Sequence, residues 1–233
     1  MTPEQAIAVL VIGLALIVGG ITAFGSSLLA AAMLVAIGGV GSLAAWVPIL
    51  ALSGLVQATM IAGRGLHRVQ WRQVALVLIM MGLGLPFGRW FAMTVPDWLV
   101  RVTLGLLLLM GGLLIPWLTR GERQVRLPLA VRVVVLALAG CVHGGFASGG
   151  TLLIPYMRLT LTAKERFRST LASIWIVMNT GLLIMLGVRA ATAGGADGGD
   201  DGFGRTVAQW APTAAAACLA AVAATWVGAR LAR

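Results

Sequence analysis

Charged residues are scarce in this chain of 233 residues. They make up 10% of it, whereas soluble domains carry about 25%. Apolar residues make up 60%, and the two values together exclude a disordered chain, a coiled coil and an ordinary water-soluble globule. Cysteine is scarce too, since Cys141 and Cys218 are the only two and both lie inside apolar stretches. We therefore expect no disulfide framework, no metal site and no cofactor.

Acidic residues are the rarest charged groups, and all seven lie at the ends of long apolar runs or between them. Proton-driven carriers usually place carboxylates within the membrane, so the sequence does not favour a carboxylate relay. An intramembrane enzyme would need a cluster of acids, bases or metal ligands, which the runs lack, so we expect no enzyme. An anion leaving a negative cytoplasm gains about 2.3 kcal/mol per charge per 100 mV. The missing acids thus agree with a facilitator of outward anion movement.

Apolar runs follow one another along the whole chain, and most are long enough to cross a membrane. A crossing needs about 20 apolar residues. Two runs, 24–37 and 149–161, are shorter, and each follows a longer run after a break rich in Gly and Ser. The sequence therefore predicts an all-α polytopic membrane protein of about seven to nine membrane segments, including broken or re-entrant short helices. The runs cover 6–23, 24–37, 43–62, 73–93, 99–118, 129–147, 149–161, 169–188 and 206–229.

Basic residues gather on one side of the membrane if every run changes sides. That side receives Arg64, Arg68, Arg72, Arg120, Arg123, Arg126, Arg132, Lys164, Arg166, Arg168, Arg230 and Arg233. Only Glu122 and Glu165 oppose them. By the positive-inside rule this side is cytoplasmic, which places the N-terminus outside and the C-terminus in the cytoplasm. The net charge of +10 then needs no nucleic acid as partner. On the outer side, Arg89 and Arg101 either extend to the membrane surface or attract anions.

The chain also repeats itself weakly. The tripeptide FGS at 24–26 matches FAS at 146–148, and the same offset pairs Gln57 with Asn179, each midway along a run. Five runs separate the two starts, so the copies have opposite orientations. The sequence thus predicts two inverted repeats, 1–122 (with the connecting span 99–118) and 123–233. Such repeats are typical of secondary transporters, which bind substrate at the repeat interface near the midplane.

The breaks and the mid-span polar residues are the candidate anion site. Broken helices expose backbone N–H groups and a positive dipole end. Gln57 and Asn179 can donate hydrogen bonds without carrying charge, although amides also join membrane helices. His143 either meets the anion, couples protons or is a neutral structural residue. Arg158 is either an inner gate or extends to the cytoplasm. The predicted substrate-binding residues are Phe24, Ser26, Ser27, Gln57, His143, Phe146, Ser148, Gly149, Gly150, Thr151 and Asn179.

The segment GGFASGGTLLIP at 144–155 resembles the glycine-rich signature of the sulfite exporter TauE/SafE family of membrane transporters. The polar residues around Ser169, the Arg- and Trp-containing segment 64–72 and the segment 228–232 also look similar. The resemblance implies two inverted repeats in the bacterial cytoplasmic membrane.

The same resemblance implies an exporter or facilitator of a small oxyanion, such as sulfite, a sulfonate or a related organosulfur anion. The first copy of the motif lacks the paired glycines and the proline. A membrane assembly or sensor subunit that transports nothing therefore stays open as the alternative. The sequence also leaves open whether the chain forms a homo-oligomer.

Overall fold

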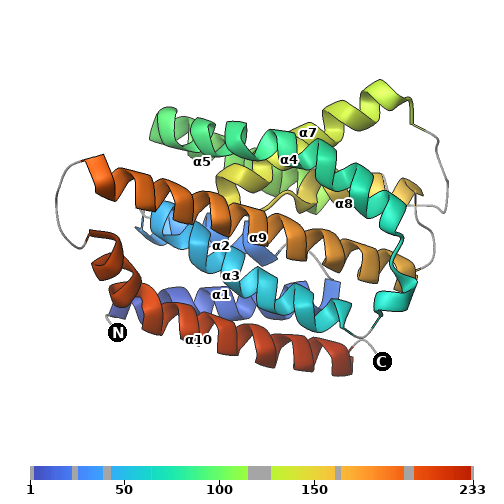
Figure 1. Cartoon of the computed structure of the whole chain (residues 1–233). Helices are drawn as coiled ribbons and strands as arrows, with labels where there is room; N and C mark the ends of the chain where they lie inside the picture. Colours follow the sequence, from blue (N-terminus) through green and yellow to red (C-terminus); the bar gives the residue numbers. More distant parts are fainter. Residues whose placement is uncertain are drawn as a thin grey trace.

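The regular structure is helical throughout the part of the chain that the computed structural model describes, residues 3–22, 26–38, 43–63, 65–114, 127–160, 164–196 and 202–231. Within these residues nine α-helices are present (Figure 1). A short 3-10 helix at Leu66–Arg68 lies between α3 and α4, and a π-helical turn at Met110–Leu114 continues from the end of α5. The α-helices are α1 (Pro3–Thr22), α2 (Ser26–Gly38), α3 (Leu43–Ala62), α4 (Trp71–Thr94), α5 (Asp97–Leu109), α7 (Leu129–Phe146), α8 (Gly150–Thr160), α9 (Lys164–Ala196) and α10 (Gly202–Leu231).

Three of the described helical segments are long and apolar enough to cross a membrane: Trp71–Thr94, Leu129–Phe146 and Arg166–Val188. The shorter apolar segments are Gln5–Gly19, Ser26–Ile37, Trp46–Ala62 and Ala211–Val227. The outer face of α4 is apolar and exposed, which is unfavourable in water. Ile79, Leu83 and Phe87 recur every four residues, and each is more than 60% exposed. An apolar stripe of this kind suits lipid, so the prediction of an all-α polytopic membrane protein agrees with the structure.

The break after α7 is closed by local hydrogen bonds. Ala147 ends the helix in the left-handed region with φ 52°, and its N–H donates to the His143 carbonyl at 2.8 Å. Helix α8 then starts at Gly150 and has 11 residues, or about 16 Å at 1.5 Å per residue. It is too short to cross about 30 Å of hydrocarbon, as the short run predicted. In the other half α1 and α2 are also separate helices, although residues 23–25 between them lie outside the described part.

Helices α3 and α9 lie side by side in the middle of the bundle (Figure 1). On one side of this pair α1 packs against α10, and on the other α4 packs against α7. Helix α10 also contacts α3, and α4 contacts α9. Each outer pair therefore joins one helix from the first half of the sequence to one from the second.

Helices α4 and α7 approach each other backbone to backbone because four glycines face one another. A β-carbon on Gly84 or Gly88 would overlap the carbonyl of Ala137 or Cys141 on α7. One on Gly140 or Gly144 would overlap the carbonyl of Met81 or Leu85 on α4. In lipid, where apolar burial supplies little drive between helices, such close approach is how they gain contact energy. The pair is therefore tightly fixed.

The described basic side chains divide unequally between the two ends of the bundle. Helix α1 begins at the end where α9 finishes, and α10 ends at the opposite end (Figure 1). The end of the bundle where α10 finishes also holds the starts of α4, α7 and α9 (Figure 1). By their positions in or next to these elements and at the end of α8, the described arginines at this end are Arg68, Arg72, Arg132, Arg158, Arg166, Arg168 and Arg230. At the other end Arg101 is exposed, whereas Arg89 is only 7% exposed. Of the two roles expected for Arg89, extension to the membrane surface is wrong, because Arg89 is buried and lies one turn after Leu85, which faces Gly144 of α7. Attraction of anions stays a prediction.

Candidate functional site

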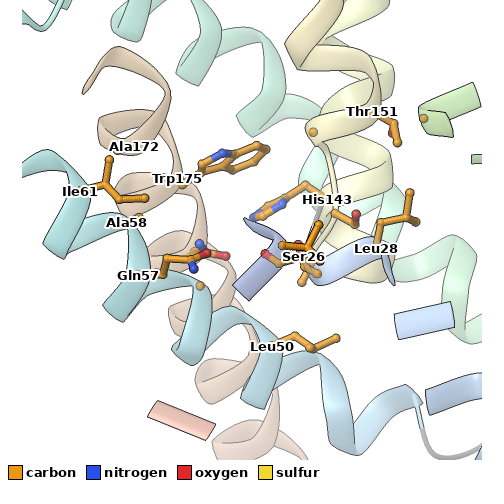
Figure 2. Close-up of a pocket in the computed structure, with 18 of the residues that line it drawn as sticks. Ser26, Leu28, Leu50, Gln57, Ala58, Ile61, His143, Thr151, Ala172 and Trp175 are labelled. Carbon is orange, nitrogen blue, oxygen red and sulfur yellow. The ribbon is translucent and has the colours of Figure 1, made fainter. Parts of the chain in front are cut away.

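A cavity of about 260 Å³ lies where the broken helices meet α3 and α9 (Figure 2). It receives side chains from the starts of α2 and α8, from the end of α7, and from the middle of α3 and α9. The structure brings together eight of the predicted site residues in its lining: Ser26, Ser27, Gln57, His143, Ser148, Gly150, Thr151 and Asn179. Phe24 lies outside the described residues.

Helix periodicity explains how α3 and α9 line one cavity. On α9 the lining positions recur every three or four residues, which keeps them on one face. They are Arg168, Ala172, Trp175 and Asn179. On α3, which runs antiparallel to α9 (Figure 1), the lining positions have the same spacing. They are Leu50, Gly54, Gln57 and Ile61. Each stripe extends about 16 Å at 1.5 Å per residue, so the cavity is elongated along the helices.

The two mid-span amides lie on the neighbouring helices α3 and α9 and are used differently. Gln57 Nε2 donates a hydrogen bond to the Leu16 carbonyl at 2.9 Å, which ties α3 to the last turns of α1. Asn179 is 5% exposed, lines the cavity, and approaches Gly54 so closely that a β-carbon there would stand 3.3 Å from its Nδ2. Gln57 therefore joins helices in addition to lining the cavity, and the two amides are not equivalent.

His143 points from the end of α7 toward the space between Trp175 and Ser26 (Figure 2). It is 1% exposed, and its ring stacks on the Trp175 indole with a centroid distance of 5.2 Å and an interplanar angle of 29°. The Gly149 N–H donates to His143 Nδ1 at 3.5 Å. Because Nδ1 accepts, the proton of the neutral ring belongs on Nε2. The Met178 backbone lies near the ring, and Nε2 has no hydrogen-bond partner within the described part of the chain.

Two predicted residues at the α7–α8 break, Phe146 and Gly149, are not among the lining residues and pack in the protein beside the cavity. Phe146 is 2% exposed and belongs to the hydrophobic core. A β-carbon on Gly149 would stand 2.5 Å from the Ala139 carbonyl and 3.0 Å from His143 Cβ. Gly149 is therefore a position of close packing that lets the break fold back on α7. Ser148 and Thr151, buried at 4% and 6% exposure, are the break's polar side chains that reach the cavity.

A model of the family "Sulfite exporter TauE/SafE" matches residues 8–233. The chain belongs to the TauE/SafE family. Its members are membrane transporters of sulfur-containing anions and are not enzymes, so the resemblance of the 144–155 motif is confirmed. No curated protein and no solved structure matches the chain.

In this TauE/SafE protein the arginine at the cavity is Arg168, whereas the sequence analysis singled out Arg158. Arg158 is exposed, lies outside the lining, and stacks its guanidinium over Phe167 at 5.2 Å. Its role as a gate stays a prediction. Arg168 lines the cavity, although the charge pattern had placed it in the cytoplasmic group. Trp175 was also missed, and the three- and four-residue spacing back from Asn179 would have indicated both.

Proposed function

We propose that this chain is an exporter or facilitator of a small oxyanion, sulfite, a sulfonate or a related organosulfur anion, which binds in the cavity between two inverted repeats. One observation carries the proposal. The cavity collects hydroxyl groups from both broken helix pairs, side-chain amides from α3 and α9 and a single arginine, and no carboxylate side chain is among its described lining residues. Uncharged donors with one cation suit an anion that must also be released.

The starts of two helices add to the attraction. Ser26 and Ser27 are the first two residues of α2, and Gly150 and Thr151 are the first two of α8. The first N–H groups of a helix have no partner within it, and the positive end of its dipole favours anions. Since both starts line the cavity, an oxyanion there would meet donors from both sides.

The packing of the outer helices supports the two inverted repeats, 1–122 and 123–233. In such a division α1 corresponds to α7, and α4 to α10. A two-fold relation between the copies would then convert the α4–α7 pair into α10–α1, and both pairs are present. The same relation leaves the central pair, α3 and α9, facing itself across the axis, where secondary transporters bind substrate.

The charge distribution supports a topology with the N-terminus outside and the C-terminus in the bacterial cytoplasm. Most of the described arginines lie at the end of the bundle where α10 finishes, and basic segments stay in the cytoplasm. Arg168 lies near the start of α9, at this end. An anion from the cytoplasm would meet Arg168 before the amides. Outward movement would then gain about 2.3 kcal/mol per charge per 100 mV without a coupling ion.

Flux into proteoliposomes tests the proposal. Purified protein should carry sulfite or a small sulfonate across the bilayer, and Asn179→Ala should lose most of that flux. Thr103→Ala is the matched control, because Thr103 donates a hydrogen bond to the Leu99 carbonyl of its own helix and is not among the described lining residues. An anion at 100 times its Kd should also stabilise the protein by about 2.7 kcal/mol. Absence of both flux and stabilisation would favour the assembly or sensor subunit.

A further inference from the structure

A connecting segment lies at one end of the two helices that line the cavity, α3 and α9. Of the lining residues on these helices, Ile61 is nearest the end of α3 and Arg168 is nearest the start of α9. Beyond Ile61, residues 65–70 lead from α3 toward α4 and include the 3-10 helix Leu66–Arg68. This 65–70 segment lies at the end of the cavity that the proposed topology places toward the cytoplasm (Figure 1).

The 65–70 segment is docked on the two residues that follow Arg168. A β-carbon on Gly65 would overlap Ser169 Oγ and would stand 3.4 Å from Ser169 Cβ. The Gln70 N–H donates a hydrogen bond to Thr170 Oγ1 at 3.1 Å. Ser169 and Thr170 are both buried. Each end of the segment is therefore held against the first turns of α9.

Between these two contacts the segment is open to the surroundings. Leu66 is 53% exposed, and His67 and Arg68 are exposed too. Segments with few buried apolar contacts open more easily than the core of a protein. Gly63 directly follows α3, and a glycine can absorb the backbone change that such an opening needs, because its range of φ and ψ is wide.

The docked segment joins two helices that are held by different neighbours. Helix α3 is tied to α1 by the hydrogen bond from Gln57 to the Leu16 carbonyl, and it also packs against α10. Helix α9 is tied to α7 by the stacking of Trp175 on His143, and it also packs against α4. Alternating access requires such groups of helices to move relative to each other around the site. If α3 and α9 part at this end, the contact between Gly65 and α9 must break.

We propose that the 65–70 segment is the cytoplasmic gate of the cavity, which is closed when Gly65 and Gln70 are docked on Ser169 and Thr170. The inference rests on the proposed function and adds to it the part of the chain that controls access to the site. Loss of one neutral hydrogen bond changes an equilibrium about 2- to 13-fold. Loss of the bond from Gln70 to Thr170 should therefore favour the open form by about that factor.

The experiment measures how fast a membrane-impermeant thiol reagent reaches the cavity from the cytoplasmic side. Ala58→Cys places a thiol in the lining, in the full chain with Cys141 and Cys218 replaced by alanine. Labelling at position 58 is followed by mass spectrometry. Thr170→Val, which removes the acceptor of the Gln70 N–H, should speed this labelling about 2- to 13-fold.

Thr225→Val is the matched control for this change. Thr225 is as buried as Thr170, but it donates its hydrogen bond to the Ala221 carbonyl of its own helix and is not among the described lining residues. The rate of labelling at position 58 should therefore be the same with and without Thr225→Val.

A cysteine pair tests the closed form directly. Gly65→Cys and Ser169→Cys would place two β-carbons 3.4 Å apart, close to the spacing of about 3.5–4.5 Å in a disulfide. Oxidation of the pair should stop labelling at position 58, and a reductant should restore it. Gly65→Cys alone controls for the oxidant, since it should show no such change.

The outcomes separate the gate from the proposed function, because labelling needs no transported anion. If the disulfide does not form, or if position 58 is labelled equally in the oxidised and reduced pair, the gate is overturned. If labelling depends on the disulfide but the reduced protein carries no anion, the proposed function fails and the gate stands. If Thr170→Val does not fold, the cysteine pair still decides.

Discussion

The contact between α4 and α7 makes a quantitative prediction about a single methyl group. Gly84→Ala adds a β-carbon that would overlap the Ala137 carbonyl and lie 2.7 Å from the Cys141 nitrogen and 3.0 Å from the Gly140 carbonyl carbon. Ordinary contacts of a β-carbon begin at 3.4 Å. All three neighbours are backbone atoms, so no side chain can rotate away, and the helices themselves must separate.

The expected loss follows from that separation. Overpacking a well-packed site costs about 1–3 kcal/mol. A gap of 0.5–1 Å along the rest of the interface forfeits about a quarter to a half of each contact's attraction. We therefore expect the upper part of the range, about 2–3 kcal/mol. At about 2–4 °C per kcal/mol for a chain of this size, Gly84→Ala should lower Tm by about 4–12 °C, measured by tryptophan fluorescence in detergent.

The same helix supplies the control. Gly82 is two residues away, and a β-carbon there would meet nothing within 4 Å. Gly82→Ala should keep Tm or raise it, because Ala favours a helix by up to about 1 kcal/mol over Gly. If the two variants melt within about 1 °C of each other, the backbone contact does not hold α4 against α7 and the reasoning is refuted.

Three further changes test the site. Gln57→Leu removes the bond to the Leu16 carbonyl and should lower the free energy of unfolding by about 1–3 kcal/mol; denaturant unfolding with unchanged stability would contradict this. Arg168→Gln should raise KM for a sulfonate about 13- to 160-fold, since a hydrogen bond to a charged group is worth about 1.5–3 kcal/mol. Arg158→Gln should leave KM unchanged, and equal effects of the two would argue against Arg168 as the cavity charge. Ala147→Gly relieves the positive φ and should add about 1 kcal/mol of stability, so a lower Tm would count against strain at the break.

Local features of the fold could be predicted from the sequence because each leaves a local signal. The short length of α8 follows from a short apolar run after a glycine-rich break. The pairing of α4 with α7 leaves a weaker signal. Gly84, Gly88, Gly140 and Gly144 show two small-residue faces, but glycine spacing does not say which helix a face will meet. That choice depends on how the whole bundle closes.

Some residues of the candidate site could also be predicted from local sequence signals, whereas others depend on how the bundle folds. Ser148 and Thr151 adjoin the break, so the glycine-rich motif indicated them directly. Gln57 came from the repeat offset, but its bond to α1 depends on a carbonyl that only the folded bundle brings near. Arg168 was counted with the cytoplasmic side, and its place in the cavity lining was missed because charge counting does not say which way a helix face turns. The role of Trp175 in the cavity lining was missed for a similar reason. An aromatic residue on a membrane helix can face lipid, a neighbouring helix or a cavity, and the sequence does not say which.

The pairing of α1 with α10 affects how the chain can fold during synthesis. Helix α1 is made long before α10, the helix that covers it, which is completed about 200 residues later. At about 5–20 residues per second, α1 waits about 10–40 s in the bilayer before its partner exists. During that time its inner face, with Leu16 among the buried residues, must be covered by lipid or by an insertion factor. Truncation just before α10 would extend this interval indefinitely, so quality control by membrane proteases should recognise such a chain first at α1.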